Sequence, residues 1–274
     1  MFALLTLASR AAQMGGRSLV DFRTRGLSLE TTKKPDGTLV TEADARASRI
    51  IQRVLKAGDP YAFILDEEAV NTHDLERPKY FWIVDPLDGT SAFIEGADTF
   101  CTMIARMQGN IPVLGVIYFP VSNTLFWGGY RQGAWMKVGD QPARELSGRR
   151  IQLMEQVRMT TPTKVVTRAL FMRIAQSLNV QAVEIDQPSG GLYTGILNNG
   201  HDLVITRPGR PAVWDTAAGH AILLAAGGKI VDLHGDPLNY QEGTHLKYGS
   251  VAVIDPSLLP VILHQLPPRN ELIP

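Results

Sequence analysis

The chain has 274 residues, of which 45% are hydrophobic and 20% charged, and its 27 basic and 27 acidic side chains give a formal net charge of zero. These values are ordinary for a soluble globular protein, and the lack of a basic excess argues against a nucleic-acid polymer as partner. A single cysteine, Cys101, excludes an intrachain disulfide, and no apolar run reaches the ~20 residues that a membrane-spanning helix needs. We therefore expect a cytoplasmic protein without a membrane span.

Residues 1–150 are predicted to form an α+β sub-domain. Helices are expected at about 2–23 and 41–56, and Thr41 with Asp44 three positions later has the spacing of a helix capping box. The polar stretch 139–150 is expected to be a boundary loop. Apolar runs bounded by turn residues predict strands at 61–65, 80–84, 100–107, 111–119 and 124–130.

Residues 151–274 are predicted to form a second, α/β sub-domain in which strands and helices alternate. The expected strands are 157–160, 180–185, 202–206, 229–233 and 250–254. The expected helices are 164–178, 191–198, 216–226 and 256–265. The predicted fold class is therefore mixed α/β layers, with two sub-domains that meet at a cleft.

Three acidic motifs stand where apolar elements end or helices begin. Residues 66–68 read Asp-Glu-Glu, residues 85–90 read Asp-Pro-Leu-Asp-Gly-Thr, and residues 214–219 read Trp-Asp-Thr-Ala-Ala-Gly. Each motif alone has an ordinary explanation in turn chemistry, a solvated strand end or a favourable helix dipole. Their occurrence together at the ends of apolar elements favours catalysis.

The second motif has the features of a metal and phosphate site. Its glycine permits a tight turn, so Asp85 and Asp88 can converge on one point with the carbonyl of Leu87 between them. Hard divalent cations such as magnesium favour this oxygen-only ligand set. The amides of Gly89 and Thr90 are then expected to face a phosphate group. One cysteine and six histidines without zinc-binding spacing exclude the usual zinc signatures.

The motifs at 85–90 and 214–219 resemble the two signature motifs of the inositol monophosphatase superfamily. Residues 39–44 and the acidic motif at 66–68 precede them in the expected order, so the resemblance covers nearly the whole chain. It implies the layered αβαβα sugar-phosphatase fold and the lithium-sensitive hydrolysis of a small phosphate ester with two or three magnesium ions. It also implies a homodimer, for which the sequence shows no interface.

The resemblance assigns roles to individual residues. Thr90, assisted by Asp44, resembles the pair that orients the attacking water, and Asp88 is placed with them among the catalytic residues. The family's usual Gly-Glu-Glu reads Asp-Glu-Glu here, so Glu68 stays an alternative to Glu67 as a ligand. The implied magnesium ligands are Glu67, Asp85, the carbonyl of Leu87, Asp88 and Asp215.

The substrate is indicated by a departure from the family pattern. Inositol monophosphatases carry a glutamate seven residues before the aspartate of the Trp-Asp motif, and this chain has Pro208 there, beside Arg207 and Arg210. Arginine side chains suit bidentate recognition of phosphate, so we expect both to bind a second phosphate on the substrate. Residues 214–221 also look closer to the bacterial 3′(2′),5′-bisphosphate nucleotidases of sulfate assimilation, which we place ahead of inositol-1-monophosphatase.

The rest of the pocket is predicted from residues 188–193, where Ser189 and Gly190 are expected to contact the substrate. His220 follows Asp215 by five residues, about 140° around the helix, and is interpreted as structural. A sugar bisphosphatase and a catalytically silent phosphate-binding relative are the remaining alternatives. The silent relative would have lost a metal carboxylate, and none is missing from this sequence.

Overall fold

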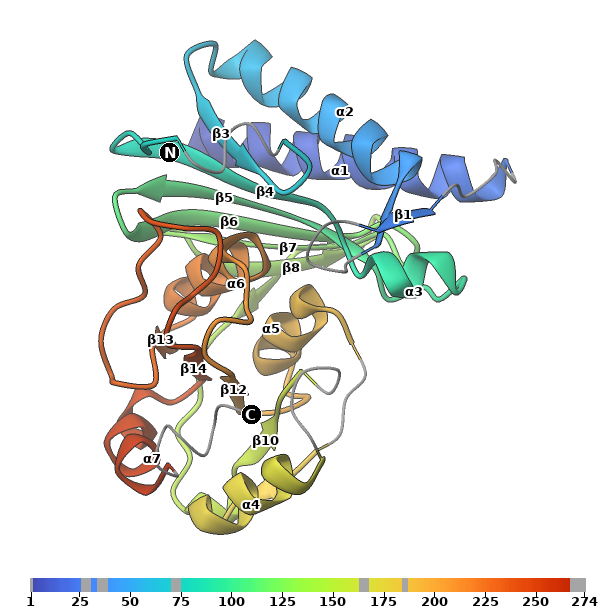
Figure 1. Ribbon diagram of the computed structural model, residues 1–274. Coiled ribbons are helices and arrows are strands. Elements are labelled where there is room, and N and C mark those ends of the chain that lie inside the picture. Colours follow the sequence, from blue (N-terminus) through green and yellow to red (C-terminus); the bar gives the residue numbers. More distant parts are fainter. Residues whose placement is uncertain are drawn as a thin grey trace.

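A computed structural model arranges the chain in alternating layers of helix and sheet (Figure 1). It describes residues 2–25, 31–33, 39–69, 75–162, 168–183 and 187–266. Helices α1 and α2 cover a large sheet, helices α5 and α6 lie between this sheet and a smaller one, and helices α4 and α7 cover the far side (Figure 1). This is the αβαβα arrangement that the resemblance implied.

The helices have the following bounds: α1 (Phe2–Thr24), α2 (Glu42–Gly58), α3 (Thr90–Ile94), α4 (Arg168–Leu178), α5 (Ser189–Leu197), α6 (Val213–Ala225) and α7 (Leu259–Gln265). Within the described residues, none of them combines the length and the apolar character that crossing a bilayer requires. The 3-10 turns are η2 (Met154–Gln156) and η3 (Pro256–Leu258).

Among the described residues, the larger sheet has seven strands in chain order, with β3 parallel to β4 and every later neighbour antiparallel. Its strands are β3 (Phe63–Asp66), β4 (Tyr80–Asp88), β5 (Cys101–Gln108), β6 (Ile111–Phe119), β7 (Thr124–Gly129), β8 (Gly133–Val138) and β9 (Arg144–Leu146). A short antiparallel pair, β1 (Thr31–Lys33) with β2 (Leu39–Thr41), precedes α2.

The smaller sheet is mixed and has the order β11-β10-β12-β14-β13 in the described part of the chain. Strand β10 runs parallel to both of its neighbours, whereas β14 is antiparallel to β12 and β13. Its strands are β10 (Arg158–Thr160), β11 (Gln181–Ala182), β12 (Leu203–Thr206), β13 (Lys229–Val231) and β14 (Ser250–Val253).

Alternate residues of each sheet face different cores. In β4, Phe81 and Ile83 pack with α5 and α6, whereas Trp82 packs beneath α1 and α2. In β12, Val204 joins the core around α5 and α6, and Leu203 joins the core beneath α4 and α7. This period of two is the pattern of strands buried on both faces. One hydrophobic cluster thus contains residues from before and after position 150. The larger sheet lies wholly before that position in the sequence, and the smaller sheet wholly after it.

Several predicted bounds were wrong. The stretch 139–150 is not only a loop, because Arg144–Leu146 forms β9, whose Leu146 is buried in the shared core. Strand β8 and the short helix α3 were not predicted, and α6 begins at Val213 rather than at residue 216. The predicted strand 180–185 is observed only as β11, and residues 184–186 lie outside the described part.

Helix α6 lies unusually close to the larger sheet. A Cβ atom on Gly115 of β6 would stand 2.3 Å from the carbonyl oxygen of Ala218, and one on Gly219 would stand 2.3 Å from Cγ of Tyr193 in α5. Side chains at these positions would push α6 away from its neighbours. Gly115 therefore sets the distance of α6 from the sheet and Gly219 its distance from α5, and the position of Asp215 depends on both.

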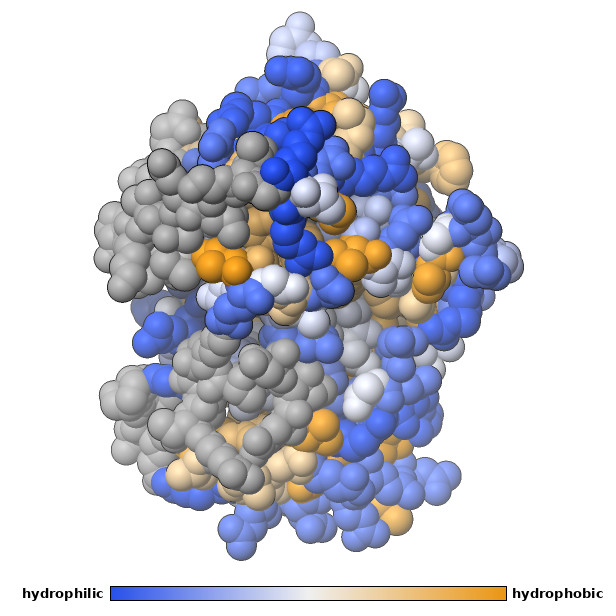
Figure 2. All heavy atoms as spheres, turned by 90° about the vertical axis from the view of Figure 1, so that its right-hand side faces the viewer, coloured by the Kyte–Doolittle hydropathy of each residue, from blue (hydrophilic) through white to orange (hydrophobic). Residues whose placement is uncertain are grey.

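One face of the molecule is shown in Figure 2. Hydrophilic side chains predominate among the described residues on this face, and the hydrophobic ones lie in small separate groups. Small separate apolar groups are ordinary on a soluble protein surface, so this distribution singles out no docking site there.

Candidate active site

A β-bulge brings two aspartates together near the end of β4. In a regular strand, Asp85 and Asp88 would point to opposite faces, because they are an odd number of residues apart. In the structure, Asp85 pairs with Met103 and Asp88 with Cys101, so three steps along β4 match two steps along β5. The extra residue reorients the strand locally, which lets both carboxylates point the same way.

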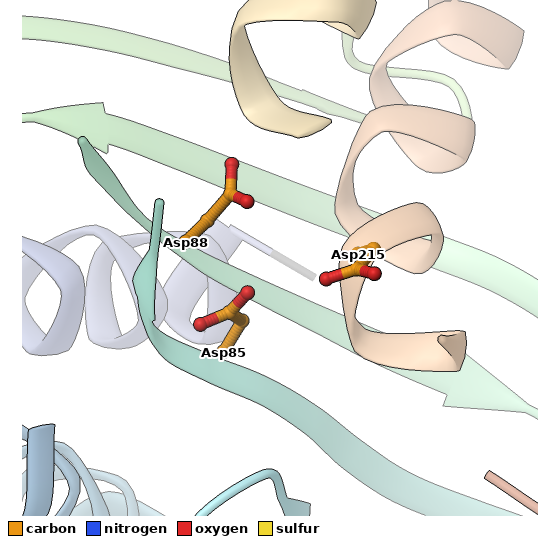
Figure 3. A group of neighbouring side chains, drawn as sticks. All are labelled: Asp85, Asp88 and Asp215. Carbon is orange, nitrogen blue, oxygen red and sulfur yellow. The ribbon is translucent and has the colours of Figure 1, made fainter. Parts of the chain in front are cut away.

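A third aspartate comes from the other half of the chain. Asp215 lies in the first turn of α6, where its Oδ2 accepts the N–H of Ala212 at 3.2 Å. Figure 3 shows the side chains of Asp85, Asp88 and Asp215 pointing toward one another. One carboxylate oxygen from each lies within 4.8 Å of the other two. Oxygens at this spacing can share a metal ion.

The electrostatics of this group favour a bound cation. Burial raises the pKa of Asp85 well above its usual range, and the charges of Glu67, Asp88 and Asp215 raise it further, in that order. Burial also raises the pKa of Asp88 to about 6, although hydrogen bonds to its carboxylate lower it. A divalent cation would relieve both the desolvation and the mutual repulsion of these groups.

Glu67 lies close enough to be the strongest neighbouring charge on Asp85, although it is not one of the three carboxylates that converge within 4.8 Å. Its amide N–H donates to the carbonyl of Val84 at 3.1 Å, which ties the acidic turn to β4. Glu67 therefore lies beside the three aspartates, and its choice over Glu68 as a ligand stays a prediction.

Thr90 and Asp44 meet beside this group. The Thr90 hydroxyl lies 3.2 Å from Oδ1 of Asp44 and 3.3 Å from the carbonyl oxygen of Leu87, and it can donate to either. The other oxygen of Asp44 accepts the N–H and the hydroxyl of Thr41, which confirms the predicted capping box of α2. Gly89 precedes Thr90 with φ +90°, and a Cβ there would collide with Pro188 at 2.4 Å. This turn therefore requires glycine.

The start of α5 contacts the same group. The amide N–H groups of Ser189 and Gly190 donate to the two oxygens of Asp88, at 3.1 and 2.6 Å. The sequence placed both residues against the substrate. The structure places their amides on a carboxylate, while Ser189 also lines the neighbouring pocket.

A pocket of about 90 Å³ adjoins Asp215. Its wall includes Arg207 and Arg210, which the sequence analysis assigned to phosphate binding, together with Leu192 and Tyr193 of α5. The hydroxyl of Tyr193 lies 3.5 Å from the hydroxyl of Thr216, and burial raises the pKa of Tyr193 to about 12. The pocket thus combines apolar side chains, two arginines and the carboxylate of Asp215 in one wall.

Two further buried residues, Cys101 and His220, make side-chain hydrogen bonds in or near the site. Cys101 is buried, and its thiol donates to Oδ2 of Asp88 at 3.4 Å, a contact that the sequence did not predict. The residues are on different strands, and nothing local to either one indicates the pairing. His220 is buried with its Nδ1 2.9 Å from the hydroxyl of Tyr240, in agreement with a packing role.

The model of the inositol monophosphatase family matches residues 3–265. The chain belongs to the inositol monophosphatase family. Among curated relatives, the 3′(2′),5′-bisphosphate nucleotidase CysQ of Buchnera aphidicola is 27% identical over 248 residues, covering 89% of this chain and 90% of the relative. The protein of the same name from Salmonella typhimurium is 30% identical over 241 residues, covering 86% and 94%.

Solved structures of this family share the fold. Inositol monophosphatase II of Staphylococcus aureus superposes with a TM-score of 0.81 at 21% identity and covers 100% of this chain and 97% of its own. CysQ from Bacteroides thetaiotaomicron superposes with a TM-score of 0.70 at 22% identity, covering 91% and 96%. The predicted fold and family are therefore confirmed.

Proposed function

We propose that this chain is a magnesium-dependent phosphatase whose substrate is a small molecule with two phosphates, of the 3′(2′),5′-bisphosphate nucleotide class. Membership of the inositol monophosphatase family supports hydrolysis of a small phosphate ester, and the curated relatives named as bisphosphate nucleotidases support the substrate class. The observation that carries the proposal is the pocket with Arg207 and Arg210 directly beside Asp215.

The donor set fits magnesium. All the candidate ligands are oxygens, and the carboxylates of Asp85, Asp88 and Asp215 converge although their burial and like charge oppose it. Glu67 and the carbonyl of Leu87 complete the proposed ligands. Bound magnesium would supply positive charge to the phosphate oxygens and lower the pKa of a coordinated water.

Thr90 and Asp44 are proposed to orient the water that attacks phosphorus. When the Thr90 hydroxyl donates to Asp44, its oxygen lone pairs are left to accept a hydrogen bond from that water. Asp44 is itself held by Thr41, so the pair is fixed before substrate binds. Positioning of this kind accounts for a large share of catalysis in phosphoryl transfer.

Arg207 and Arg210 are proposed to bind the phosphate that is not hydrolysed. A guanidinium can donate two parallel hydrogen bonds to a phosphate. These bonds fix the orientation of the phosphate, and the positive charge of the guanidinium balances part of its negative charge. With one phosphate on the arginines, the other would be directed toward the aspartates. A homodimer and lithium sensitivity stay predictions of the resemblance, and a cytoplasmic location stays a prediction from the composition of the chain.

The test is phosphate release from 3′-phosphoadenosine 5′-phosphate and from inositol 1-phosphate, each with magnesium and with chelator. We expect magnesium-dependent release with a strong preference for the bisphosphate. Arg210→Ala should raise KM for the bisphosphate by about tenfold, since it removes a charge-assisted contact. Arg53→Ala, an exposed change on α2 across the larger sheet, is the matched control. Preference for inositol 1-phosphate would contradict the assigned substrate class.

A further inference from the structure

Three donors hold the carboxylate of Asp88. Ser189 N–H lies 3.1 Å from Oδ1, Gly190 N–H lies 2.6 Å from Oδ2, and the Cys101 sulfur lies 3.4 Å from Oδ2. Two of these donors belong to the first turn of α5 and the third to β5. Both oxygens of Asp88 are therefore oriented by groups from two different layers of the fold.

The distance between these layers depends on a contact between Cys101 and Gly190. A Cβ atom on Gly190 would stand 2.3 Å from the sulfur of Cys101, and the next atoms, on Asp88 and Ile117, would lie at 3.2 Å. The Gly190 amide reaches Asp88 only because position 190 carries no side chain. The sulfur of Cys101 fills the space that remains, with none of the residue exposed.

Helix α5 also forms part of the substrate pocket, through Ser189, Leu192 and Tyr193. The segment that orients Asp88 is thus the segment that would contact the substrate. A shift of its first turn would move a candidate metal ligand and the pocket wall together. Packing alone would require only that Cys101 touch carbon atoms, whereas its sulfur contacts the carboxylate itself.

We propose that Cys101 is a positioning residue, which spaces the first turn of α5 from the end of β4 so that Asp88 is held in its metal-binding orientation. This inference rests on the proposed function in taking Asp88 to be a magnesium ligand. Partners that orient a ligand are worth about 10- to 100-fold in metal affinity, so the role is measurable without turnover.

The experiment compares the magnesium dissociation constants of metal-stripped full-length proteins by titration calorimetry, with thermal unfolding as the check on folding. Gly190→Ala should weaken magnesium binding by about tenfold, because its methyl group collides with the sulfur. Adding Cys101→Ala to that variant lets the new methyl group take the place of the sulfur as the spacer, so the double variant should regain most of the affinity, whereas Cys101→Ala alone leaves the space empty and should lose affinity.

Gly191→Ala is the matched control. Its added methyl group, also in the first turn of α5, meets Oε1 and Cβ of the exposed Gln187, at 2.3 and 2.9 Å, and neither Cys101 nor Asp88 is among its nearest atoms. Its magnesium affinity should stay within about twofold of the natural chain. Both substitutions add the same methyl group to the same helical turn, so a difference between them isolates the contact with Cys101.

Unchanged affinity in Gly190→Ala, or no recovery in the double variant, would overturn the proposal. If Gly190→Ala does not fold, two single variants of Cys101 replace it. Magnesium affinity that is lost in Cys101→Ala and regained in Cys101→Ser supports the role of Cys101. Magnesium affinity that is the same in both variants and in the natural chain overturns it. A natural chain that binds magnesium but releases no phosphate from either test substrate contradicts the proposed function alone.

Discussion

At the scale of the residue, Asp88 combines burial, three hydrogen-bond donors and two neighbouring carboxylates. Asp88→Asn keeps the shape but removes the negative charge, so we expect turnover to fall by at least about 100-fold at saturating magnesium. The fold should persist, because a neutral side chain no longer opposes its own burial. Steady-state kinetics and circular dichroism check this prediction. Substantial activity in this variant would contradict the place of Asp88 in the catalytic group.

Two buried histidines make the free energy of unfolding depend on pH. Burial lowers the pKa of His220 to about 3 and that of His201 to about 4, from 6.5 in an unfolded chain. As pH falls below 6.5, the unfolded chain binds protons that the folded chain does not, so the free energy of unfolding decreases toward pH 4. His220→Gln should make this slope shallower by about 1 kcal/mol per pH unit.

The measurement is denaturant unfolding at several pH values between 7 and 5, in the presence of chelator. The natural chain, measured at the same pH values, is the comparison. A slope that is the same in His220→Gln and in the natural chain would mean that His220 takes up its proton without unfolding.

Residue by residue, the motif at 85–90 was sufficient to predict that Asp85 and Asp88 converge, because its glycine permits a tight turn after an apolar strand, whereas Asp215 was placed with them by the resemblance. The donors to Asp88 were not predictable in the same way. Gly190 lies 102 residues from Asp88, and its amide, rather than a side chain, makes the contact. No local pattern marks a backbone amide as the partner of a distant carboxylate.

At the scale of the element, the fit between α6 and β6 determines where Asp215 lies. Gly115→Ala would place a methyl group 2.3 Å from a carbonyl oxygen of α6, an atom that cannot move alone. We expect a loss of about 1–3 kcal/mol in the free energy of unfolding, together with weaker magnesium binding as Asp215 is displaced. Unfolding curves and calorimetry measure the two effects. Lower stability with unchanged magnesium affinity would show that α6 adjusts without moving Asp215.

Element bounds followed from the sequence where apolar runs were long and clearly ended. The predicted strand 111–119 is β6 without correction, since a turn closes it at each end. Strand β9 was missed because its neighbours are polar and only Leu146 is buried. Helix α6 begins early because Val213 and Trp214 are buried as its first turn, which a count from alanine-rich positions does not detect.

At the scale of the whole molecule, the proposed ligands come from both halves of the chain. Magnesium should therefore stabilise the entire fold, by about 2.7 kcal/mol at 100 times its dissociation constant, which is about 5 °C in the melting temperature. Asp215→Asn should lose most of this increase. Thermal unfolding with magnesium chloride, against potassium chloride of equal ionic strength, tests it. An equal rise in both salts would indicate screening rather than binding.

The shared core between the two sheets has a consequence for synthesis. Strands β3 to β9 leave the ribosome before α6. The face of the larger sheet that α6 covers is therefore exposed to solvent while the residues between β9 and α6 are translated. Exposed apolar surface of this kind invites aggregation during folding. Asp85 and Asp88 are made early, and their partner Asp215 reaches them only when α6 covers that face. A nascent chain that stops short of α6 is thus expected to be prone to aggregation and catalytically inactive, which couples the completion of the proposed metal site to the completion of the protein.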